Sequence, residues 1–274
     1  MSFLRNIIKN RNNDEFSERK KLERIIAITN QKGGVGKSTT AVNVSAYLSL
    51  YGYKTLIIDL DPQSNSTSGL GMNSTDLKAS IYDILIHEME PDEVILNTRY
   101  ENLNIIPSSI QLAGAEVELV SSLKREFKLK EAVNKIQEDY DFIIIDCPPA
   151  LGLLTINALT AAKEVIIPIQ CEYYALEGLG QLLNTINLVK KNLNDDLNIK
   201  GAIMTMYDPR IKLAGQVIEE VKNFFSEKVY KTVIPRNVRL SEAPSYGKSI
   251  MEYDPDCKGA EAYSNFTKEV IENG

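Results

Sequence analysis

The sequence predicts a single α/β domain with a mainly parallel, twisted β-sheet and helices on both of its faces. From residue 24 onward, short segments rich in Ile and Val alternate with longer segments of helical periodicity. The short segments are apolar along their whole length, which is typical of strands buried on both faces of a parallel sheet. No Gly-, Ser- or Pro-rich linker divides the 274 residues and no internal repeat is present, so one domain is expected.

Each predicted strand is a short β-branched run, and each predicted helix repeats apolar residues every three to four positions. The strands are expected at residues 25–29, 55–60, 103–107, 142–146, 165–169, 202–206 and 229–234. The helices are expected at residues 38–51, 110–123, 129–138, 153–162, 178–193, 213–225 and 260–272.

Residues 1–23 are polar and highly charged, and they precede the first predicted strand. Four apolar side chains in this stretch have the spacing of one face of a short helix, but a flexible, solvated extension is the favoured interpretation. The ordered domain is therefore expected to cover residues 24–274.

Composition excludes several classes of function. The net charge of −6 and the pI of 5.1 exclude a globally basic nucleic-acid binder, so any DNA-binding surface must be a local patch. A single histidine, His87, argues against Ser-His-Asp catalysis, and three scattered cysteines argue against a disulfide framework or a zinc site. The apolar runs are far below the ~18 residues of a spanning helix, so a cytoplasmic protein is expected.

Residues 31–39 read Gln-Lys-Gly-Gly-Val-Gly-Lys-Ser-Thr and lie between a predicted strand and a predicted helix. This is the context of a phosphate-binding P-loop. The glycines at 33, 34 and 36 allow backbone N–H groups to turn toward phosphate oxygens, and the helix N-terminus adds partial positive charge. Lys37 supplies a charge for the terminal phosphates, and the Ser38 hydroxyl suits Mg²⁺.

Carboxylates stand at the ends of two other predicted strands. Asp59 and Asp61 close the strand at 55–60, and Asp146 closes the strand at 142–146. Ligands of open α/β sheets bind at the carboxyl ends of the strands, where these acids would hold a metal and orient water. Turn or helix-cap aspartates are common at such positions, but together with the P-loop the three acids predict a Mg²⁺-nucleotide site.

The stretch from Lys32 to Ser38 resembles the deviant Walker A motif of the ParA/MinD group of P-loop ATPases, with Gln31 standing where the usual motif has Gly. The resemblance implies ATP and Mg²⁺ as cofactors, and it implies that Lys32 reaches the partner's phosphates in a nucleotide-sandwich homodimer. It assigns Asp61 to positioning the attacking water and Asp146 to Mg²⁺ through water, while Asp59 supports the metal and the surrounding loop. The nucleotide-binding residues implied are Lys32, Gly33, Gly34, Val35, Gly36, Lys37, Ser38 and Thr39.

Residues 61–69, 205–210 and 234–245 resemble the chromosomal ParA (Soj) branch of this group. By this resemblance, Pro235 and Asn237 lie at the adenine, and Arg210 and Arg239 contact DNA. The resemblance further implies non-specific DNA binding by the ATP dimer, a ParB-type protein that stimulates hydrolysis, and a location on the nucleoid. A role in regulating replication initiation, through an initiator protein, is also implied.

The charge pattern supports a DNA-binding patch independently, since residues 200–250 hold nine basic and five acidic residues within an acidic chain. The main alternative function is a MinD-like, membrane-cycling regulator of cell division. That function predicts a basic amphipathic helix at the C-terminus. The final stretch of this chain, residues 263–274, is acidic instead. A bacterial tyrosine kinase would require a C-terminal tyrosine cluster, whereas the tyrosines here are dispersed.

Overall fold

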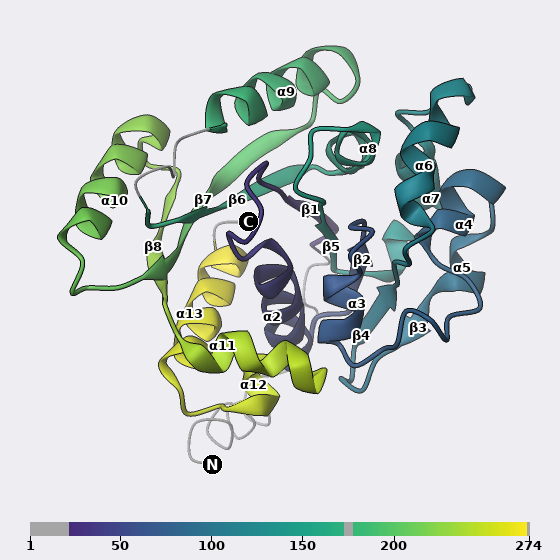
Figure 1. Ribbon diagram of the computed structural model, residues 1–274. Helices are drawn as coiled ribbons and strands as arrows, with labels where there is room; N and C mark the ends of the chain where they lie inside the picture. The colour runs from purple at the N-terminus through teal and green to yellow at the C-terminus, as the bar shows by residue number, and fades with distance from the viewer. Residues whose placement is uncertain (1–21, 173–177, 273–274) are drawn as a thin grey trace.

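One eight-stranded sheet organises the computed structural model, which describes residues 22–172 and 178–272 (Figure 1). All but the first of the neighbouring strand pairs in this sheet are parallel. The strands run in the order β3 (Leu96–Asn97), β4 (Leu103–Ile106), β2 (Thr55–Asp59), β5 (Phe142–Asp146), β1 (Arg24–Ile28), β6 (Glu164–Gln170), β7 (Asn198–Tyr207), β8 (Val229–Pro235).

The predicted α/β class, parallel sheet and seven strands are confirmed, and the predicted helices are found with small shifts at their ends. The segment predicted as one helix over 110–123 is shorter and continues as a 3₁₀ turn. Nearly all of the predicted extension 1–23 lies outside the described residues. The helical elements are α2 (Lys37–Leu50), α3 (Asn65–Gly69), α4 (Ile81–His87), α5 (Pro91–Val94), α6 (Leu112–Glu118), η1 (Leu119–Ser121), α7 (Lys128–Ile136), η2 (Gln137–Asp139), α8 (Leu153–Ala161), α9 (Leu179–Asn192), α10 (Lys212–Phe225), α11 (Val238–Glu242), η3 (Ala243–Tyr246), α12 (Ile250–Tyr253) and α13 (Lys258–Glu272).

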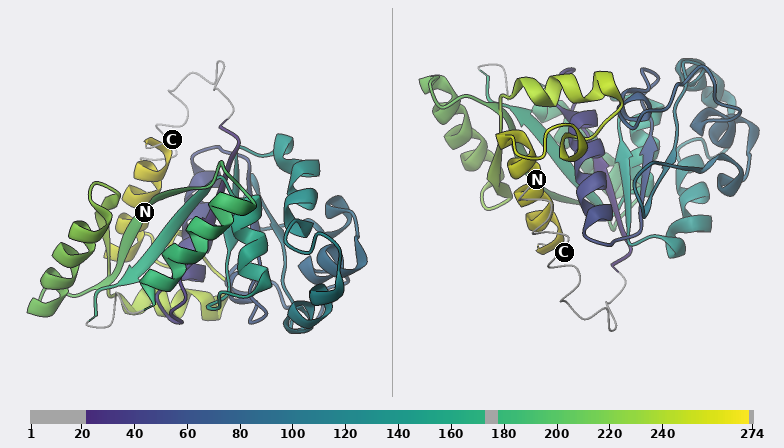
Figure 2. Two further views of the ribbon diagram at one scale, coloured as in Figure 1. Left: turned by 90° about the horizontal axis from the view of Figure 1, so that it is seen from above. Right: turned by 90° about the horizontal axis from the view of Figure 1, so that it is seen from below.

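Helices cover both faces of the sheet in two layers (Figure 2). The residues of the central strand β1 show which helices cover which face. Side chains alternate between the two faces of a strand. Ile26 and Ile28 of β1 therefore join one core cluster, with α2 and α13. Ile25 and Ala27 join the other core cluster, which includes residues of α7, α8 and α9.

Helix α13 covers α2, the helix that follows the phosphate loop. Hydrogen bonds join α13 to α2 and to Tyr51, the residue after α2. They link Thr40 Oγ1 with the Tyr263 hydroxyl at 3.1 Å, Tyr47 Oη to the Ala260 carbonyl at 2.8 Å, and the Tyr51 hydroxyl with Ser264 Oγ at 2.7 Å and with the Ser264 carbonyl at 3.4 Å. The apolar face of α13 is buried in the core by this packing.

The strand register brings the predicted acids together. Asp146 at the end of β5 is paired in the ladder with Ile28 of β1 on one side and with Asp59 of β2 on the other. The phosphate loop leaves β1 at this same edge, so the carboxyl ends of three neighbouring strands form one site. Within the described residues, no helix is both long and apolar enough to cross a membrane.

Candidate nucleotide site

The phosphate loop joins β1 to α2, and two of its glycines have left-handed backbones. Gly34 has φ 73° and Gly36 has φ 91°, a region that residues with a Cβ adopt only with strain. Gly36 is the N-cap of α2, and the adjacent Val35 is buried, its carbonyl accepting a hydrogen bond from Thr205 Oγ1 at 2.8 Å. The loop is thus fixed against β7 with its backbone exposed around the N-terminus of a helix, the arrangement that binds phosphate.

Gln31, which stands where the usual motif has glycine, attaches the loop to another helix. Its Nε2 donates to Gln181 Oε1 on α9 at 3.0 Å, and its side chain lies against Gly178, the N-cap of α9. The departure from the common motif therefore adds a contact between the phosphate loop and α9.

Lys37 is buried at the start of α2, where its Nζ donates to the Lys32 carbonyl at 3.2 Å. Burial lowers the pKa of Lys37, and the Asp146 carboxylate acts against this shift by favouring the charged form. An ammonium held on a loop carbonyl keeps two further N–H donors for anionic oxygens.

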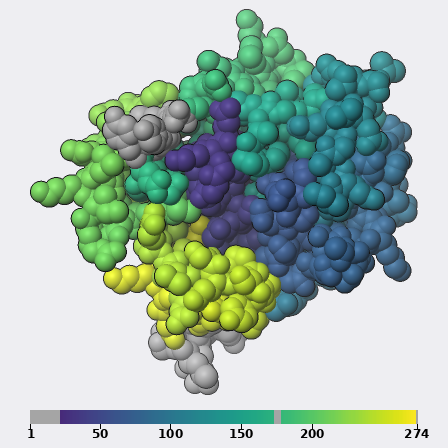
Figure 3. Space-filling view, in the orientation of Figure 1, coloured from purple at the N-terminus to yellow at the C-terminus, as the bar shows by residue number. Residues whose placement is uncertain are grey.

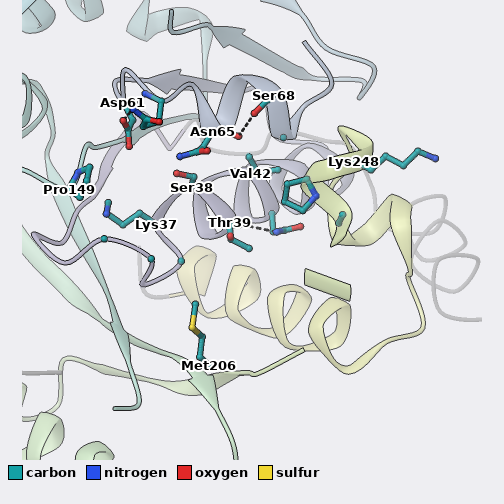
Figure 4. A pocket seen from close by; sticks show the side chains of 18 residues that line it. Lys37, Ser38, Thr39, Val42, Asp61, Asn65, Ser68, Pro149, Met206 and Lys248 are labelled. Carbon is teal, nitrogen blue, oxygen red and sulfur yellow. Dashed lines mark hydrogen bonds between the residues drawn. The ribbon is translucent and has the colours of Figure 1, made fainter. Parts of the chain in front are cut away.

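A cavity of about 330 Å³ opens in front of this loop (Figure 3). Figure 4 shows Lys37, Ser38 and Asp61 toward one side of it, with Met206 on the other side of the loop. The cavity is lined by Gly33, Gly34, Gly36, Lys37, Ser38, Thr39, Val42, Asn43, Asp61, Gln63, Asn65, Ser68, Gly69, Pro149, Met206, Ala243, Pro244 and Lys248.

Two of the three predicted acids, Asp59 and Asp146, are fully buried, and the third, Asp61, lines the cavity. Asp59 accepts hydrogen bonds from the Asp61 backbone at 3.2 Å and from the Thr67 backbone and hydroxyl at 2.8 and 2.7 Å. Asp61 faces the cavity, and its Oδ1 accepts from the Gln63 backbone at 2.9 Å. Asp61 is therefore placed to act on a ligand directly, whereas Asp59 organises the loop after β2.

Asp146 has the features of a metal-binding carboxylate. Its Oδ2 accepts a hydrogen bond from Ser66 Oγ at 2.7 Å. Its Oδ1 is buried without a hydrogen-bond partner. Burial raises the pKa of Asp146, and both burial and the Asp146 charge raise the pKa of Asp59. A divalent cation near Ser38 and Asp146 would satisfy the orphaned oxygen and relieve the repulsion, so these residues fit Mg²⁺.

The residues predicted at the adenine do not line the cavity. Pro235 ends β8, and Asn237 caps α11 by accepting from the Arg239 backbone at 2.8 Å. Met206, Ala243 and Pro244 line this side of the cavity instead. Met206 has a left-handed backbone, with φ 54°, at the end of β7. This conformation is uncommon for a residue with a side chain, and strained residues concentrate at functional sites.

Lys32, predicted to reach a partner's phosphates, also does not line the cavity of its own chain. The predicted DNA contacts lie beyond the same edge of the sheet. Arg210 follows β7 and Arg239 follows β8, a few residues after the paired positions Tyr207 and Pro235. The Arg210 side chain is 86% exposed and the Arg239 side chain 53% exposed.

Sequence reasoning missed the donors that hold the acids. Ser66, Thr67 and Ser108 lie within short polar segments whose composition is that of any turn. It also missed Met206, because a left-handed backbone at a methionine has no sequence signature.

The buried acids predict a pH-dependent stability difference in Asp146→Asn. A carboxyl group with a raised pKa in the folded state destabilises the protein above that pKa and has no such effect below its unfolded value of about 3.9. At pH 8, without nucleotide or metal, Asp146→Asn should be more stable than the parent by roughly 1–3 kcal/mol, at ~1.4 kcal/mol per pKa unit. The difference should shrink steadily as the pH falls toward 4. Urea denaturation across this range measures it, and an asparagine variant less stable than the parent at pH 8 would contradict the buried-charge interpretation.

Comparison with known proteins gives close relatives. Residues 23–199 match the family model described as an AAA domain. The chain is 60% identical over 251 residues to the sporulation initiation inhibitor protein Soj of Bacillus subtilis (strain 168), covering 92% of this chain and 99% of that protein. It is 50% identical over 246 residues to the chromosome-partitioning ATPase Soj of Treponema pallidum (strain Nichols), covering 90% of this chain and 96% of that protein.

A solved structure with the same fold is cobyrinic acid a,c-diamide synthase from Mycobacterium smegmatis with bound ADP and magnesium. Its TM-score is 0.81 at 38% identity, covering 91% of this chain and 94% of that one. The name of that protein refers to a different reaction, but its identity to this chain is well below that of the two Soj proteins.

Proposed function

The chain belongs to the family of Soj and ParA chromosome-partitioning ATPases, and from this premise we propose that it moves DNA by cycling between an ATP-bound dimer on DNA and a released form. One observation carries the proposal. The phosphate loop, Asp61 and the orphaned Asp146 oxygen lie at one edge of the sheet, where the loop and Asp61 line one cavity.

The proposed nucleotide is ATP with Mg²⁺. The backbone N–H groups of residues 33–39 and the Lys37 ammonium hold the phosphates, with the base toward Met206 and Pro244. Bound Mg²⁺ near Ser38 and Asp146 neutralises phosphate charge. Asp61 lies on the cavity wall, where its carboxylate can hold and orient the attacking water.

The proposed dimer is a nucleotide sandwich. Lys32 does not line its own cavity, and Gly33 is exposed with no atom within 4 Å of a Cβ built on it. The loop therefore presents a lysine beside open space, into which the loop of a second copy fits. This placement supports the predicted role of Lys32, which is contact with the phosphates bound by the other copy.

The proposed DNA surface contains Arg210 and Arg239. Each is already paired with acids of its own chain: Arg210 with Asp208 at 2.6 Å, and Arg239 with Glu242 at 2.9 Å. These exposed ion pairs contribute little to stability and leave other guanidinium donors for phosphate. One such patch binds weakly, and pairing two patches in the ATP dimer makes the second contact effectively intramolecular.

A ParB-type protein is the proposed partner that stimulates hydrolysis and so releases the dimer from DNA. Binding to DNA would locate the protein on the nucleoid. The role in replication initiation stays a prediction from the resemblance, since no described contact bears on it.

A MinD-like, membrane-cycling function has less support. It requires a C-terminal helix with a free apolar face. The apolar face of α13 packs on α2 and β8 instead, with Tyr263, Phe266 and Val270 buried.

Charge reversal tests the DNA surface. With Mg-ATP, Arg239→Glu or Arg210→Glu is expected to weaken duplex binding at least about tenfold. The slope of the logarithm of the affinity against the logarithm of the salt concentration should become shallower by ~0.9 per lost phosphate contact. Dimerisation with ATP should persist, because neither residue lies in the phosphate loop. Fluorescence anisotropy with labelled duplexes of unrelated sequence measures the first effect, and sedimentation measures the second.

Lys54→Glu is the matched control, because it makes the same charge change at the opposite edge of the sheet, just before β2. If both arginine variants bind duplex as tightly as Lys54→Glu does, the DNA surface lies elsewhere.

A further inference from the structure

Helix α3 is hydrogen bonded to both buried acids of the nucleotide site. Ser66 donates to Asp146 at 2.7 Å, and Thr67 donates twice to Asp59 at 2.7 and 2.8 Å. All four of these residues are fully buried. The position of α3 is therefore tied to the positions of the two carboxylates, beside which Mg²⁺ and phosphate would bind.

The other end of α3 meets η3 through two glycines. Gly71 follows α3 with φ 83°, and Gly247 follows η3 with φ 61°. A Cβ on Gly247 would lie 2.5 Å from the Gly71 Cα atom, and a Cβ on Gly71 would lie 3.0 Å from the Gly247 carbonyl oxygen. Two backbones touch here without side chains between them. A displacement of one backbone thus cannot be absorbed by a rotamer change.

The segment beyond this contact carries the proposed DNA residue. η3 continues directly from α11, which holds Arg239. The Arg239 guanidinium pairs with Glu242 at 2.9 Å and with Asp254 at 3.3 Å, and the Tyr253 hydroxyl donates to Glu242 at 3.0 Å. These bonds make the segment 238–246 a unit tied to α12 and the residue after it, so a shift of η3 moves the arginine with it.

We propose that the Gly71–Gly247 contact is the joint through which the phosphate end of the nucleotide site controls the arginine-bearing segment 238–246. The inference rests on the proposed function, because it takes Arg239 as a DNA contact. Mg-ATP changes the charge around Asp59 and Asp146, α3 adjusts, and the glycine contact passes the adjustment to η3 and α11. Packed elements shift between discrete arrangements, so a small displacement at the acids becomes a change in DNA affinity.

Coupling of this kind is reciprocal. If ATP tightens DNA binding through the joint, DNA must tighten ATP binding by the same factor. A residue that serves only the stability of the fold would not alter these two ratios together.

Gly247→Ala tests the joint, because the added methyl group must displace α3 or η3. Two affinity ratios are measured. The first is the affinity for duplex with Mg-ATP divided by the affinity for duplex with Mg-ADP, both from fluorescence anisotropy. The second is the affinity for a fluorescent ATP analogue with and without duplex. Both ratios are expected to fall about tenfold toward one, within the usual range of coupling between sites. Thermal unfolding by circular dichroism checks that the variant is folded.

Two further proteins make the result decisive. Gly52→Ala introduces a side chain at φ 88° after α2, away from the joint, and should keep both ratios. The double variant Gly71→Ala with Arg99→Ala probes the contact from the other side, since Arg99 Nη2 would otherwise lie 2.4 Å from the new Cβ. If Gly247→Ala does not fold, this double variant tests the contact in its place.

The outcomes separate the two hypotheses. If the parent protein binds duplex equally well with Mg-ATP and with Mg-ADP, the proposed function is wrong, and this inference is wrong with it. If the parent binds duplex more tightly with Mg-ATP, and the variants at Gly71 and Gly247 have the same two affinity ratios as the parent, only the role of the joint is wrong. If both affinity ratios fall toward one in the variants at Gly71 and Gly247, but not in Gly52→Ala, the result supports the role of the joint.

Discussion

Asp61→Ala is expected to hydrolyse ATP about 10²–10⁴-fold more slowly than the parent while still binding it, the range by which a positioned acid–base group accelerates a reaction. The Asp61 carbonyl keeps its hydrogen bond from Ser108 Oγ, at 2.7 Å, whatever the side chain is, while the bond from the Gln63 backbone to Asp61 Oδ1 is lost. Phosphate release in single turnovers and titration with a fluorescent ATP analogue measure the two properties separately.

A protein that binds ATP but cannot hydrolyse it should accumulate as dimers on DNA, even with a ParB-type partner present. Asp195→Ala, which removes an exposed loop carboxylate, controls for the loss of charge alone. Hydrolysis by Asp61→Ala at the rate of Asp195→Ala would remove Asp61 from the reaction.

Gly33→Val is expected to bind ATP as a monomer. Gly33 is exposed, and a Cβ at this position meets no atom within 4 Å, so the isolated chain accommodates the larger side chain. In the proposed sandwich, the loop of the second copy occupies that space. We expect the dimer dissociation constant to rise at least ~30-fold, the scale of a substitution at an interface hot spot.

Analytical ultracentrifugation with Mg-ATP measures this constant. Gly215→Val, at an exposed site of α10 that is equally open, makes the same substitution away from the loop. Equal dimerisation of the two variants would reject the sandwich arrangement and the role given to Lys32. The DNA affinity of Gly33→Val should fall with its dimerisation.

The sequence predicted the central strands well because their burial on both faces leaves an unbroken apolar run. β3 was missed since two residues, Leu96 and Asn97, are too few to show any periodicity. The short helices α3, α5, α11 and α12 were missed for a similar reason, as elements of four or five residues lack a full amphipathic repeat. The predicted helix over 110–123 was too long because apolar residues continue past its end, among them Val120 and Leu123, which are exposed.

The phosphate loop and its acids could be predicted because each follows a strand and strand ends converge in a parallel sheet. The remaining lining of the cavity could not be predicted in the same way. Ala243, Pro244 and Lys248 come from a segment almost 200 residues after the acids of β2, placed by tertiary packing alone. No local pattern marks that distance. The position of Pro235 and Asn237 at the adenine stays a prediction.

The packing of α13 on α2 has a consequence for biosynthesis. At ~5–20 residues per second, the ribosome needs roughly 10–40 s to proceed from the end of α2 to the start of α13. Throughout that interval Tyr47 and its neighbours on α2 lack the helix that buries them. The nascent chain thus contains its whole phosphate loop long before it can hold the loop's helix in place. The final packing of α2 therefore has to wait until α13 has been synthesised.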